Sequence, residues 1–310
     1  MLKPPEHQVA GHRAQDGQLG PLVDGCGIFY KPLQGDGRGD AEVAFYTSLF
    51  SHPAVPPHIL SFFPGFHGTL VLPASDASGP RPHLALDDLL AGLRSPSLID
   101  LKIGGRTWPP DCPEDYFQKC IVKDRESSSV ALGFRVSGVQ IQDPAGADAF
   151  WRPSRAAVRR YMVKDVRRVL RQFVSADPPS PDQKPDCALA SAVYGGPDGV
   201  LAQLMELKAW FEEQTLFHFY SASVLLVYEK DAAVAAAGQQ AGKPSGVRVK
   251  LVDFAHVMDG QGVIDHNFLG GLCSLIKFMS DVLNDPEAGG RESIKVQLSC
   301  EDGSLENLGI

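Results

Sequence analysis

The stretch Pro96–Gly104, "PSLIDLKIG", contains the pattern that decides the fold. Its large aliphatic residues are typical of a strand inside a core: Leu98, Ile99, Leu101 and Ile103. Asp100 and Lys102 interrupt them, and residues two apart on a strand point to the same face. Because a lone buried charge is costly, this carboxylate and this ammonium group must be paired, solvated or bound to a ligand. The stretch leaves these three interpretations open.

The composition around this stretch is that of a large soluble protein. The 310 residues are enough for two lobes or one large domain, and 44% hydrophobic and 21% charged residues are typical of globular chains. A formal net charge of -8 argues against bulk nucleic-acid binding. Any anion site is therefore expected to be a local basic pocket.

The cysteines and the apolar runs indicate the compartment. The six cysteines show neither a Cys-x-x-Cys pair nor a Cys/His spacing suited to zinc, which is typical of reduced thiols. We see no apolar run near the ~20 residues of a membrane helix and no signal-peptide pattern in residues 1–20. We expect an intracellular protein of the nucleus and cytoplasm without a transmembrane segment, and leave the balance between these two compartments open.

Strands dominate the first third of the chain, and helices become frequent later. Expected strands cover residues 24–33, 67–74, 83–90, 131–141, 218–229 and 247–257. Expected helices cover residues 41–50, 114–124, 154–173, 200–211 and 268–284. This order predicts an α+β fold with a sheet-rich N-lobe and a mixed C-lobe. The expected divisions are a flexible start (1–20), an N-lobe (21–90) and a C-lobe (91–310) with a mobile excursion (231–246).

Two further charged residues are placed where phosphate chemistry needs them. Lys31 lies in a strand that precedes the helix with Glu42, and in kinases a strand lysine held by a helix glutamate contacts ATP phosphates. Asp253 ends the strand in "LVDFAHV", where a projecting carboxylate suits Mg²⁺. The alternatives are a surface lysine on a strand and an aspartate that caps a turn. The residues alone leave both alternatives open.

Together these pieces resemble one family, the inositol polyphosphate kinases. The signature Pro-x-x-x-Asp-x-Lys-x-Gly is complete as Pro96, Asp100, Lys102 and Gly104, and "LGFRVSG", "SASVLLVYE" and "LVDFAHV" match further elements in order. The resemblance runs from about Gly25 to Leu283. Within the family, "RTW" and "FQKCIVKD" are most similar to the plant-type inositol polyphosphate multikinases.

The resemblance implies a two-lobed, protein-kinase-like fold with a reduced C-lobe, and it implies ATP and Mg²⁺ as cofactors. On the nucleotide side it implies that Asp100 contacts the ribose, Lys31 the phosphates, and the backbone of Asp87 and Leu89 the adenine. Glu42 would hold Lys31, and Asp253 would be the metal ligand. Asp100, Lys102 and Asp253 form the expected catalytic set.

On the substrate side, the resemblance implies that Lys102 and His256 contact phosphate groups. Lys119 and Lys123 are four residues apart on one helix face, within a segment of about 105–130 expected to bind the inositol phosphate. Three converging ammonium groups suit a ligand with several phosphates, although a solvated helix face is the alternative. Arg38, in a glycine-rich loop, is a further candidate for a substrate phosphate.

The segment between Gly104 and Gly133 is short and leaves room for about one substrate helix. An open pocket lined by flexible lysines discriminates poorly among phosphate arrangements, which favours a multikinase acting on inositol 1,4,5-trisphosphate and tetrakisphosphates. The alternatives are a non-catalytic inositol-phosphate or protein-binding scaffold and an inositol hexakisphosphate kinase. The order in which ring hydroxyls react and the general base are left open.

The expected helix over residues 154–173 is strongly basic on its polar side: Arg155, Arg159, Arg160, Lys164, Arg167, Arg168 and Arg171. A solvated outer face is the simpler interpretation, and a weak surface for anionic lipid or an acidic partner is the alternative. We expect a monomer.

Overall fold

The computed structural model describes residues 1–11, 18–143, 149–180, 182–232 and 246–285. Its N-terminal part contains a four-stranded antiparallel sheet in the order β1-β2-β4-β3. These strands are β1 (Leu22–Val23), β2 (Ile28–Pro32), β3 (Phe66–Pro73) and β4 (Pro80–Asp87). The helices α1 (Arg38–Ser51) and α2 (Pro57–Leu60) lie between β2 and β3 in the chain.

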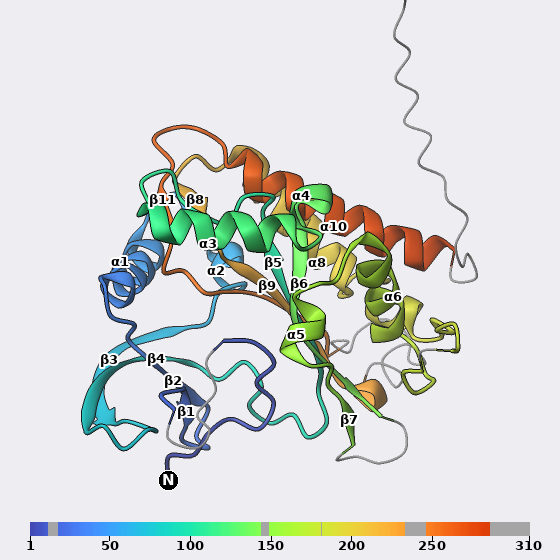
Figure 1. Cartoon of the computed structure of the whole chain (residues 1–310), viewed down its shortest axis with the longest axis horizontal. Helices are drawn as coiled ribbons and strands as arrows, with labels where there is room; N and C mark the ends of the chain where they lie inside the picture. The colour runs from blue at the N-terminus through green and yellow to red at the C-terminus, as the bar shows by residue number, and fades with distance from the viewer. Residues whose placement is uncertain (12–17, 144–148, 181, 233–245, 286–310) are drawn as a thin grey trace, which may run out of the picture.

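A five-stranded antiparallel sheet in the order β10-β9-β5-β6-β7 forms the centre of the molecule (Figure 1). Its central strand is β5 (Ser97–Ile103), the stretch that the sequence singles out. The other strands are β6 (Phe134–Gln142), β7 (Phe150–Trp151), β9 (Ser223–Tyr228) and β10 (Arg248–Val252). A small two-stranded sheet pairs β8 (Phe217–Phe219) with β11 (Val257–Asp259). This mixture of helices and sheets confirms the predicted α+β class.

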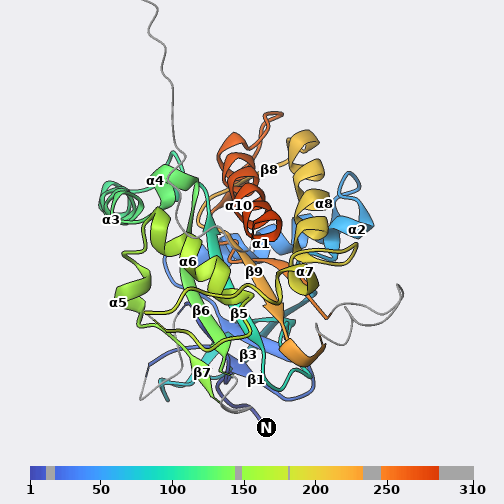
Figure 2. The ribbon, with the colours of Figure 1, turned by 90° about the vertical axis from the view of Figure 1, so that its right-hand side faces the viewer.

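The helices of the C-terminal part cover one face of the central sheet (Figure 2). They are α4 (Ser129–Leu132), α5 (Arg155–Val158), α6 (Val163–Phe173), α7 (Ala190–Val193), α8 (Val200–Glu213) and α10 (His266–Asn284), whereas α3 (Glu114–Arg125) packs against α4. Of these, α6 and α10 contact β5 and β6, and α8 contacts β10. Ile99, Leu101 and Ile103 are fully buried in the main core. Strand alternation therefore turns Leu98, Asp100 and Lys102 toward the opposite face.

A close approach of two backbones fixes the end of β5. A Cβ atom on Gly271 of α10 would lie 2.1 Å from the carbonyl oxygen of Gly133, so only glycine fits there. The same carbonyl accepts the N–H of Gly104 at 2.7 Å. Gly104 itself has a left-handed φ of 112°, which glycine adopts readily. Helix α10 is thus locked against the point where the central strand ends.

The continuous helix expected over residues 154–173 is wrong, because the chain forms the two helices α5 and α6. Met162 is extended between them, and its N–H donates to the carboxylate of Asp165 at 2.9 Å. Ser154 caps α5 by accepting the N–H of Ala157 at 3.2 Å. Local capping bonds outweigh the continuous apolar periodicity that predicted one helix.

The single strands expected over 218–229 and 247–257 are each divided in two. Ser221 separates β8 from β9 with a φ of 56°, and Asp253 begins the turn between β10 and β11 with a φ of 67°. Left-handed backbone is uncommon for residues other than glycine and is often found at functional sites. The chain leaves the central sheet for the small sheet at these two residues.

The flexible start expected over residues 1–20 stays a prediction: residues 1–11 contact the fold, and residues 12–17 lie outside the described part. Lys3 pairs with Val23 as an isolated bridge, and Val9 is only 7% exposed. The expected excursion over 231–246 lies almost wholly outside the described residues. The lobe boundary at residues 90 and 91 stays a prediction. Within the described residues, every helix is too short or too polar to cross a membrane.

Candidate active site

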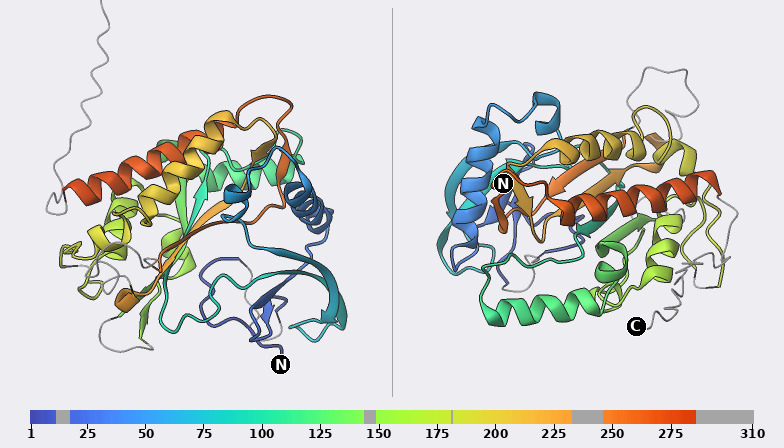
Figure 3. Two further views of the ribbon diagram at one scale, coloured as in Figure 1. Left: turned by 180° about the vertical axis from the view of Figure 1, so that it is seen from behind. Right: turned by 90° about the horizontal axis from the view of Figure 1, so that it is seen from above.

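A cavity of about 1050 Å³ is lined by residues of the four-stranded sheet, the central sheet and α3. That volume is enough for a cofactor-sized ligand. Every site residue expected from the sequence lines it: Lys31, Arg38, Glu42, Asp87, Leu89, Asp100, Lys102, Lys119, Lys123, Asp253 and His256. Two views of the ribbon, from behind and from above, show the four-stranded sheet beside the central sheet (Figure 3). Residues more than 200 positions apart in the sequence therefore share one cavity.

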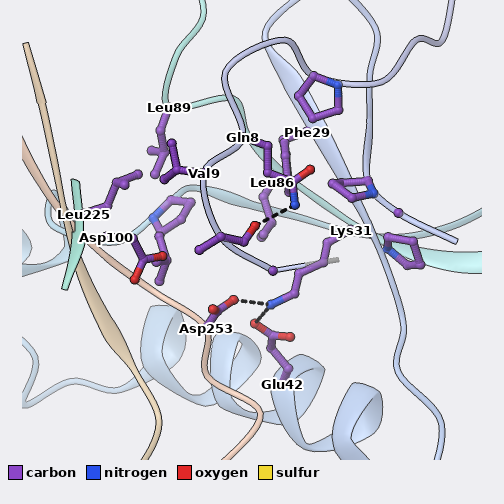
Figure 4. A pocket seen from close by; sticks show the side chains of 18 of the residues that line it. Gln8, Val9, Phe29, Lys31, Glu42, Leu86, Leu89, Asp100, Leu225 and Asp253 are labelled. Carbon is purple, nitrogen blue, oxygen red and sulfur yellow. Dashed lines mark hydrogen bonds and ion pairs between the residues drawn. The ribbon is translucent and has the colours of Figure 1, made fainter. Parts of the chain in front are cut away.

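Lys31 joins two carboxylates from distant parts of the chain (Figure 4). Its Nζ donates to Glu42 Oε1 and to Asp253 Oδ1, each at 2.8 Å. Glu42 is fully buried on α1 and also accepts the N–H of Phe254 at 3.1 Å. Burial lowers the pKa of Lys31, but Asp253 and Glu42 raise it more, and the pKa lies well above its ordinary value. Lys31 is therefore a fixed cation.

Asp253 occupies the strained turn after β10. Its side chain remains 44% exposed, so the carboxylate is open to the cavity although it touches Lys31. Strain of this kind persists only where the surrounding structure holds it, and it is frequent at active sites. Asp253 thus lies in a turn, as the alternative expected, and its exposed carboxylate is also placed to hold a metal.

Asp100 is a buried carboxylate with an unsatisfied oxygen. The residue is 5% exposed, and its Oδ1 has no hydrogen-bond partner among the described residues. Burial, together with the nearby charge of Asp253, raises the pKa of Asp100 to about 6. An unpaired buried oxygen costs free energy unless a ligand pairs with it. Asp100 lines the cavity, so its carboxylate is a candidate to accept a hydrogen bond from a ligand once that oxygen is uncovered.

Lys102 lies on the same face of β5 but does not pair with Asp100 in the described structure. Its Nζ donates instead to the carbonyl oxygen of Ser221 at 2.5 Å. Burial lowers the pKa of Lys102, partly offset by Asp253. The geometry therefore favours a charged cavity floor over the structural ion pair that the sequence left open.

The segment after β4 presents backbone groups to the cavity. The carboxylate of Asp87 accepts the N–H of Gly65 at 3.0 Å and lies 2.7 Å from His67 Nε2, so its side chain is occupied locally. The carbonyl of Leu89 accepts from Arg248 at 2.6 Å. The N–H of Leu89 has no partner within the described ranges, which leaves it available to a ligand.

The α3 side of the cavity carries exposed cations and a neutral pair. Lys119 and Lys123 are both exposed, and Lys119 pairs with Asp115 on its own helix at 3.3 Å. Tyr116 Oη lies 2.9 Å from His256 Nε2. Burial, with Arg38 and Lys102 nearby, lowers the pKa of His256 to about 4, and burial raises the pKa of Tyr116 to about 12. His256 is therefore a neutral hydrogen-bonding group at neutral pH.

Arg38 is the first residue of α1 rather than part of the preceding glycine-rich loop. Its Nε donates to Asp36 Oδ1 at 2.7 Å, and both side chains are substantially exposed. Gly37, which precedes it, has a left-handed φ of 81°. Arg38 lines the cavity from the side of the four-stranded sheet and lowers the pKa of His256, so it faces the α3 side.

A buried network that the sequence reasoning missed connects α3 to the central sheet. The carboxylate of Asp124 lies 2.5 Å from Arg135 Nη1 and accepts the hydroxyl of Thr107 at 2.8 Å. Arg135 is the register partner of Lys102 on β6. Both residues lie inside quoted motifs, Arg135 in "LGFRVSG" and Asp124 in "FQKCIVKD", and that position was the usable signal. The network fixes the C-terminal end of α3 beside Lys102.

The donor set fits a divalent cation held jointly with phosphate. Within the described residues, no group of three or more His, Cys, Asp and Glu side chains could hold a metal ion alone. Asp253 offers a hard oxygen ligand open to the cavity, and Mg²⁺ commonly takes one or two carboxylates together with substrate phosphates. The residues therefore fit a metal that arrives with a phosphate ligand.

Comparison with known proteins gives consistent results. The family model described as "Inositol polyphosphate kinase" matches residues 83–280. The protein named inositol polyphosphate multikinase IPK2 from Oryza sativa subsp. indica is 61% identical over 285 residues, which cover 91% of this chain and 95% of that protein. Inositol polyphosphate multikinase beta from Arabidopsis thaliana is 56% identical over 288 residues, covering 93% and 95%.

Solved structures show the same fold. A structure described as an inositol phosphate multikinase matches with a TM-score of 0.65 and 46% identity, covering 78% of this chain and 99% of that one. The Ipk2 multikinase of S. cerevisiae, solved with ADP and Mn²⁺, matches with a TM-score of 0.62 and 19% identity, covering 83% and 99%. The second likeness concerns the fold alone.

Proposed function

The chain belongs to the inositol polyphosphate kinase family, and we propose that it is a multikinase that transfers the γ-phosphate of ATP to ring hydroxyls of inositol polyphosphates. The proposed substrates are inositol 1,4,5-trisphosphate and its tetrakisphosphate products. One observation carries the proposal: the Lys31–Glu42–Asp253 cluster and the unsatisfied Asp100 share a cavity with Lys102. The names of the multikinase relatives support the substrate class.

On the nucleotide side, four residues of the cavity have groups suited to contact ATP or its metal ion. The N–H of Leu89 would donate to the adenine, and the unsatisfied oxygen of Asp100 would accept a ribose hydroxyl. Lys31 would contact the phosphates, since its position is fixed by Glu42. Asp253 would hold Mg²⁺, which when bound neutralises charge on the phosphate oxygens.

On the substrate side, lysine side chains would position the phosphate groups of the inositol polyphosphate. Lys102 has a lowered pKa because it is buried, and a phosphate group beside its Nζ would favour the charged form. The ring hydroxyl oxygen attacks the γ-phosphorus in line, the bond between that phosphorus and the ADP oxygen breaks, and the hydroxyl proton is released to water. Lys31 and Lys102 spread the negative charge that develops, which is the main requirement of a loose phosphoryl-transfer transition state.

The part of the cavity formed by α3 accounts for the proposed range of substrates. A single helix, α3, supplies Lys119 and Lys123, and both side chains are exposed and flexible. Long ammonium side chains bind phosphates as point charges without a fixed geometry. A site of this kind accepts several phosphate arrangements, which supports a multikinase over an enzyme specific for one isomer.

The experiment is to incubate the purified chain with ATP, Mg²⁺ and one inositol phosphate at a time, and to separate the products by chromatography. We expect new phosphate on the trisphosphate and on at least one tetrakisphosphate. Binding of inositol phosphate without any transfer would instead support a scaffold. Transfer only to the hexakisphosphate would identify a pyrophosphate-forming kinase and overturn the multikinase proposal.

A further inference from the structure

The N-terminal segment Lys3–Gly11, here called the strap, is attached to both large sheets. At its start, the N–H and carbonyl of Lys3 exchange hydrogen bonds with Val23 of β1 at 3.0 and 2.8 Å. Further along, Gln140 of β6 lies 3.2 Å from His7 Nδ1, and the His7 ring packs edge-on against Phe150 of β7 at 5.2 Å. The strap therefore crosses from the four-stranded sheet to the central sheet.

The middle of the strap is seated on the face of the central sheet that carries Asp100. Val9 is 7% exposed and packs with Leu98 and Val227, which lie on that face. Its carbonyl oxygen lies so close to Gly138 that a Cβ atom there would be 2.4 Å away. Gly138 is the β6 partner of Asp100 in the ladder. The strap backbone thus lies one strand away from the unsatisfied carboxylate.

Side chains of the strap face the nucleotide end of the cavity. Figure 4 shows Gln8 near Phe29 and Leu86, and Val9 near Leu89. All of these residues line the cavity, which keeps its volume of about 1050 Å³ with the strap in place. The strap therefore forms one side of the cavity and does not block it.

We propose that the strap completes the site for the base and ribose of the nucleotide, so that seating of the strap and binding of the nucleotide stabilise each other. This inference rests on the proposed function. A strap that is already held in place excludes water from the flat face of a bound purine. Because it is ordered before the ligand binds, binding does not pay the entropy cost of ordering it. Coupling between two binding events is reciprocal, so bound nucleotide must also hold the strap more tightly against β6.

The first test uses Gly138→Ala, which places a methyl group against the strap, since the nearest atoms to that Cβ all belong to Val9. The matched control is Gly270→Ala on α10, where an added Cβ meets nothing within 4 Å. We expect the Kd of ADP, measured by calorimetry, to rise about fivefold to tenfold in Gly138→Ala, as ordering of the site becomes part of binding. The Kd of inositol trisphosphate should stay unchanged, as should both constants in the control.

A second variant disrupts the packing of the strap on the central sheet without changing β6. Val9→Asp places a carboxylate among Leu98 and Val227, where it cannot stay buried unpaired. Val71→Asp on β3, where the valine is 69% exposed, is the matched control. Hydrogen exchange of residues 3–11 should slow when ADP binds to the wild type and should be fast in Val9→Asp with or without ADP.

The outcomes separate this inference from the proposed function. An unchanged Kd of ADP in both variants would overturn the strap as part of the site, and a lower Kd would show that it blocks the site. Wild-type protein that binds inositol trisphosphate but not ADP would overturn the proposed function itself. Either variant alone decides the matter if the other fails to fold, as judged by circular dichroism.

Discussion

The charged residues of the cavity floor explain why one strand combines a core pattern with two charges. Ile99, Leu101 and Ile103 face the helices, whereas Asp100 and Lys102 face the cavity. The predicted strand was confirmed, and the sequence alone left the pairing of its charges open. That choice depends on Ser221, which is 119 residues away and accepts from Lys102. A contact at such a distance leaves no local pattern in the sequence.

At the residue scale, we predict that Asp100→Asn stabilises the ligand-free protein at neutral pH. The pKa of Asp100 is raised to about 6 in the folded state, above its ordinary value of 3.8. Between these two values the folded state binds more protons, so ionisation of Asp100 lowers stability as pH rises. We expect the variant to gain about 1–3 kcal/mol in the free energy of unfolding at pH about 7.5.

Urea unfolding at a series of pH values measures this effect. The difference between Asp100→Asn and wild type should shrink toward zero below pH about 4, where the acid is protonated in both states. Asp281→Asn is a control, because Asp281 is exposed and, among the described residues, its side chain pairs with Lys277 on its own helix at 3.0 Å. A variant less stable than wild type at neutral pH would show that the carboxylate has a structural partner.

Helix α3 shows how far the sequence predicts an element. Its bounds, Glu114–Arg125, agree within one residue with the expected 114–124, because its periodic pattern is clear. The expected helix over 154–173 had an even clearer pattern but is interrupted at Met162 by capping bonds. Capping by Asp165 is local, but the N–H of Ser128 also donates to the carbonyl of Tyr161 at 3.1 Å, a contact that depends on the tertiary fold. Periodicity alone therefore located helices better than it located their ends.

At the element scale, Lys123→Met should weaken inositol phosphate binding selectively. We expect KM for the trisphosphate to rise about fivefold, corresponding to about 1 kcal/mol for two unit charges about 4 Å apart in water. KM for ATP should not change. Lys277→Met, which removes an exposed lysine from α10, is the control. Steady-state kinetics at two ionic strengths measures both KM values. An unchanged KM for the trisphosphate in Lys123→Met would contradict the role of α3.

The buried network that holds α3 should be strongly coupled. Asp124→Asn leaves Arg135 partly buried without its anion, and breaking such a pair costs about 3–5 kcal/mol. The double variant Asp124→Leu with Arg135→Met removes both charges and should lose less stability than the sum of its two single variants. Thermal unfolding of the wild type, the double variant and its two single variants measures the coupling. Additive losses would show that the two residues act independently.

At the scale of the whole molecule, the cavity joins two sheets and α3, and the resemblance predicted which residues meet there. It covered the chain from about Gly25 and so missed the strap, whose seat on Gly138 lies 129 positions from Val9. Residues 1–20 are polar, and their composition predicted flexibility. In the structure, Val9 is buried among Leu98 and Val227, a contact that the composition does not indicate. The fold class was therefore predictable from the sequence, but the position of the strap beside the cavity was not.

The arrangement of ligands predicts that metal and nucleotide bind together. Within the described residues, no group of three or more His, Cys, Asp and Glu side chains could hold a metal ion, so millimolar Mg²⁺ alone should leave Tm unchanged. Mg²⁺ with a non-hydrolysable ATP analogue at 100 times its Kd should stabilise the protein by about 2.7 kcal/mol. Differential scanning fluorimetry, with a chelator as the control for metal removal, measures both shifts. A large shift with Mg²⁺ alone would reveal an independent metal site.

The most direct test of the central claim is the rate of phosphate transfer from labelled ATP to inositol trisphosphate by Asp253→Asn, compared with Asp281→Asn. Asp253 links the fixed cation Lys31 to the open end of the cavity, and loss of one preorganised charged group at a transition state lowers kcat by about 10²–10³. We predict at least this loss for Asp253→Asn and a wild-type rate for Asp281→Asn. A rate for Asp253→Asn close to that of the wild type would contradict the account.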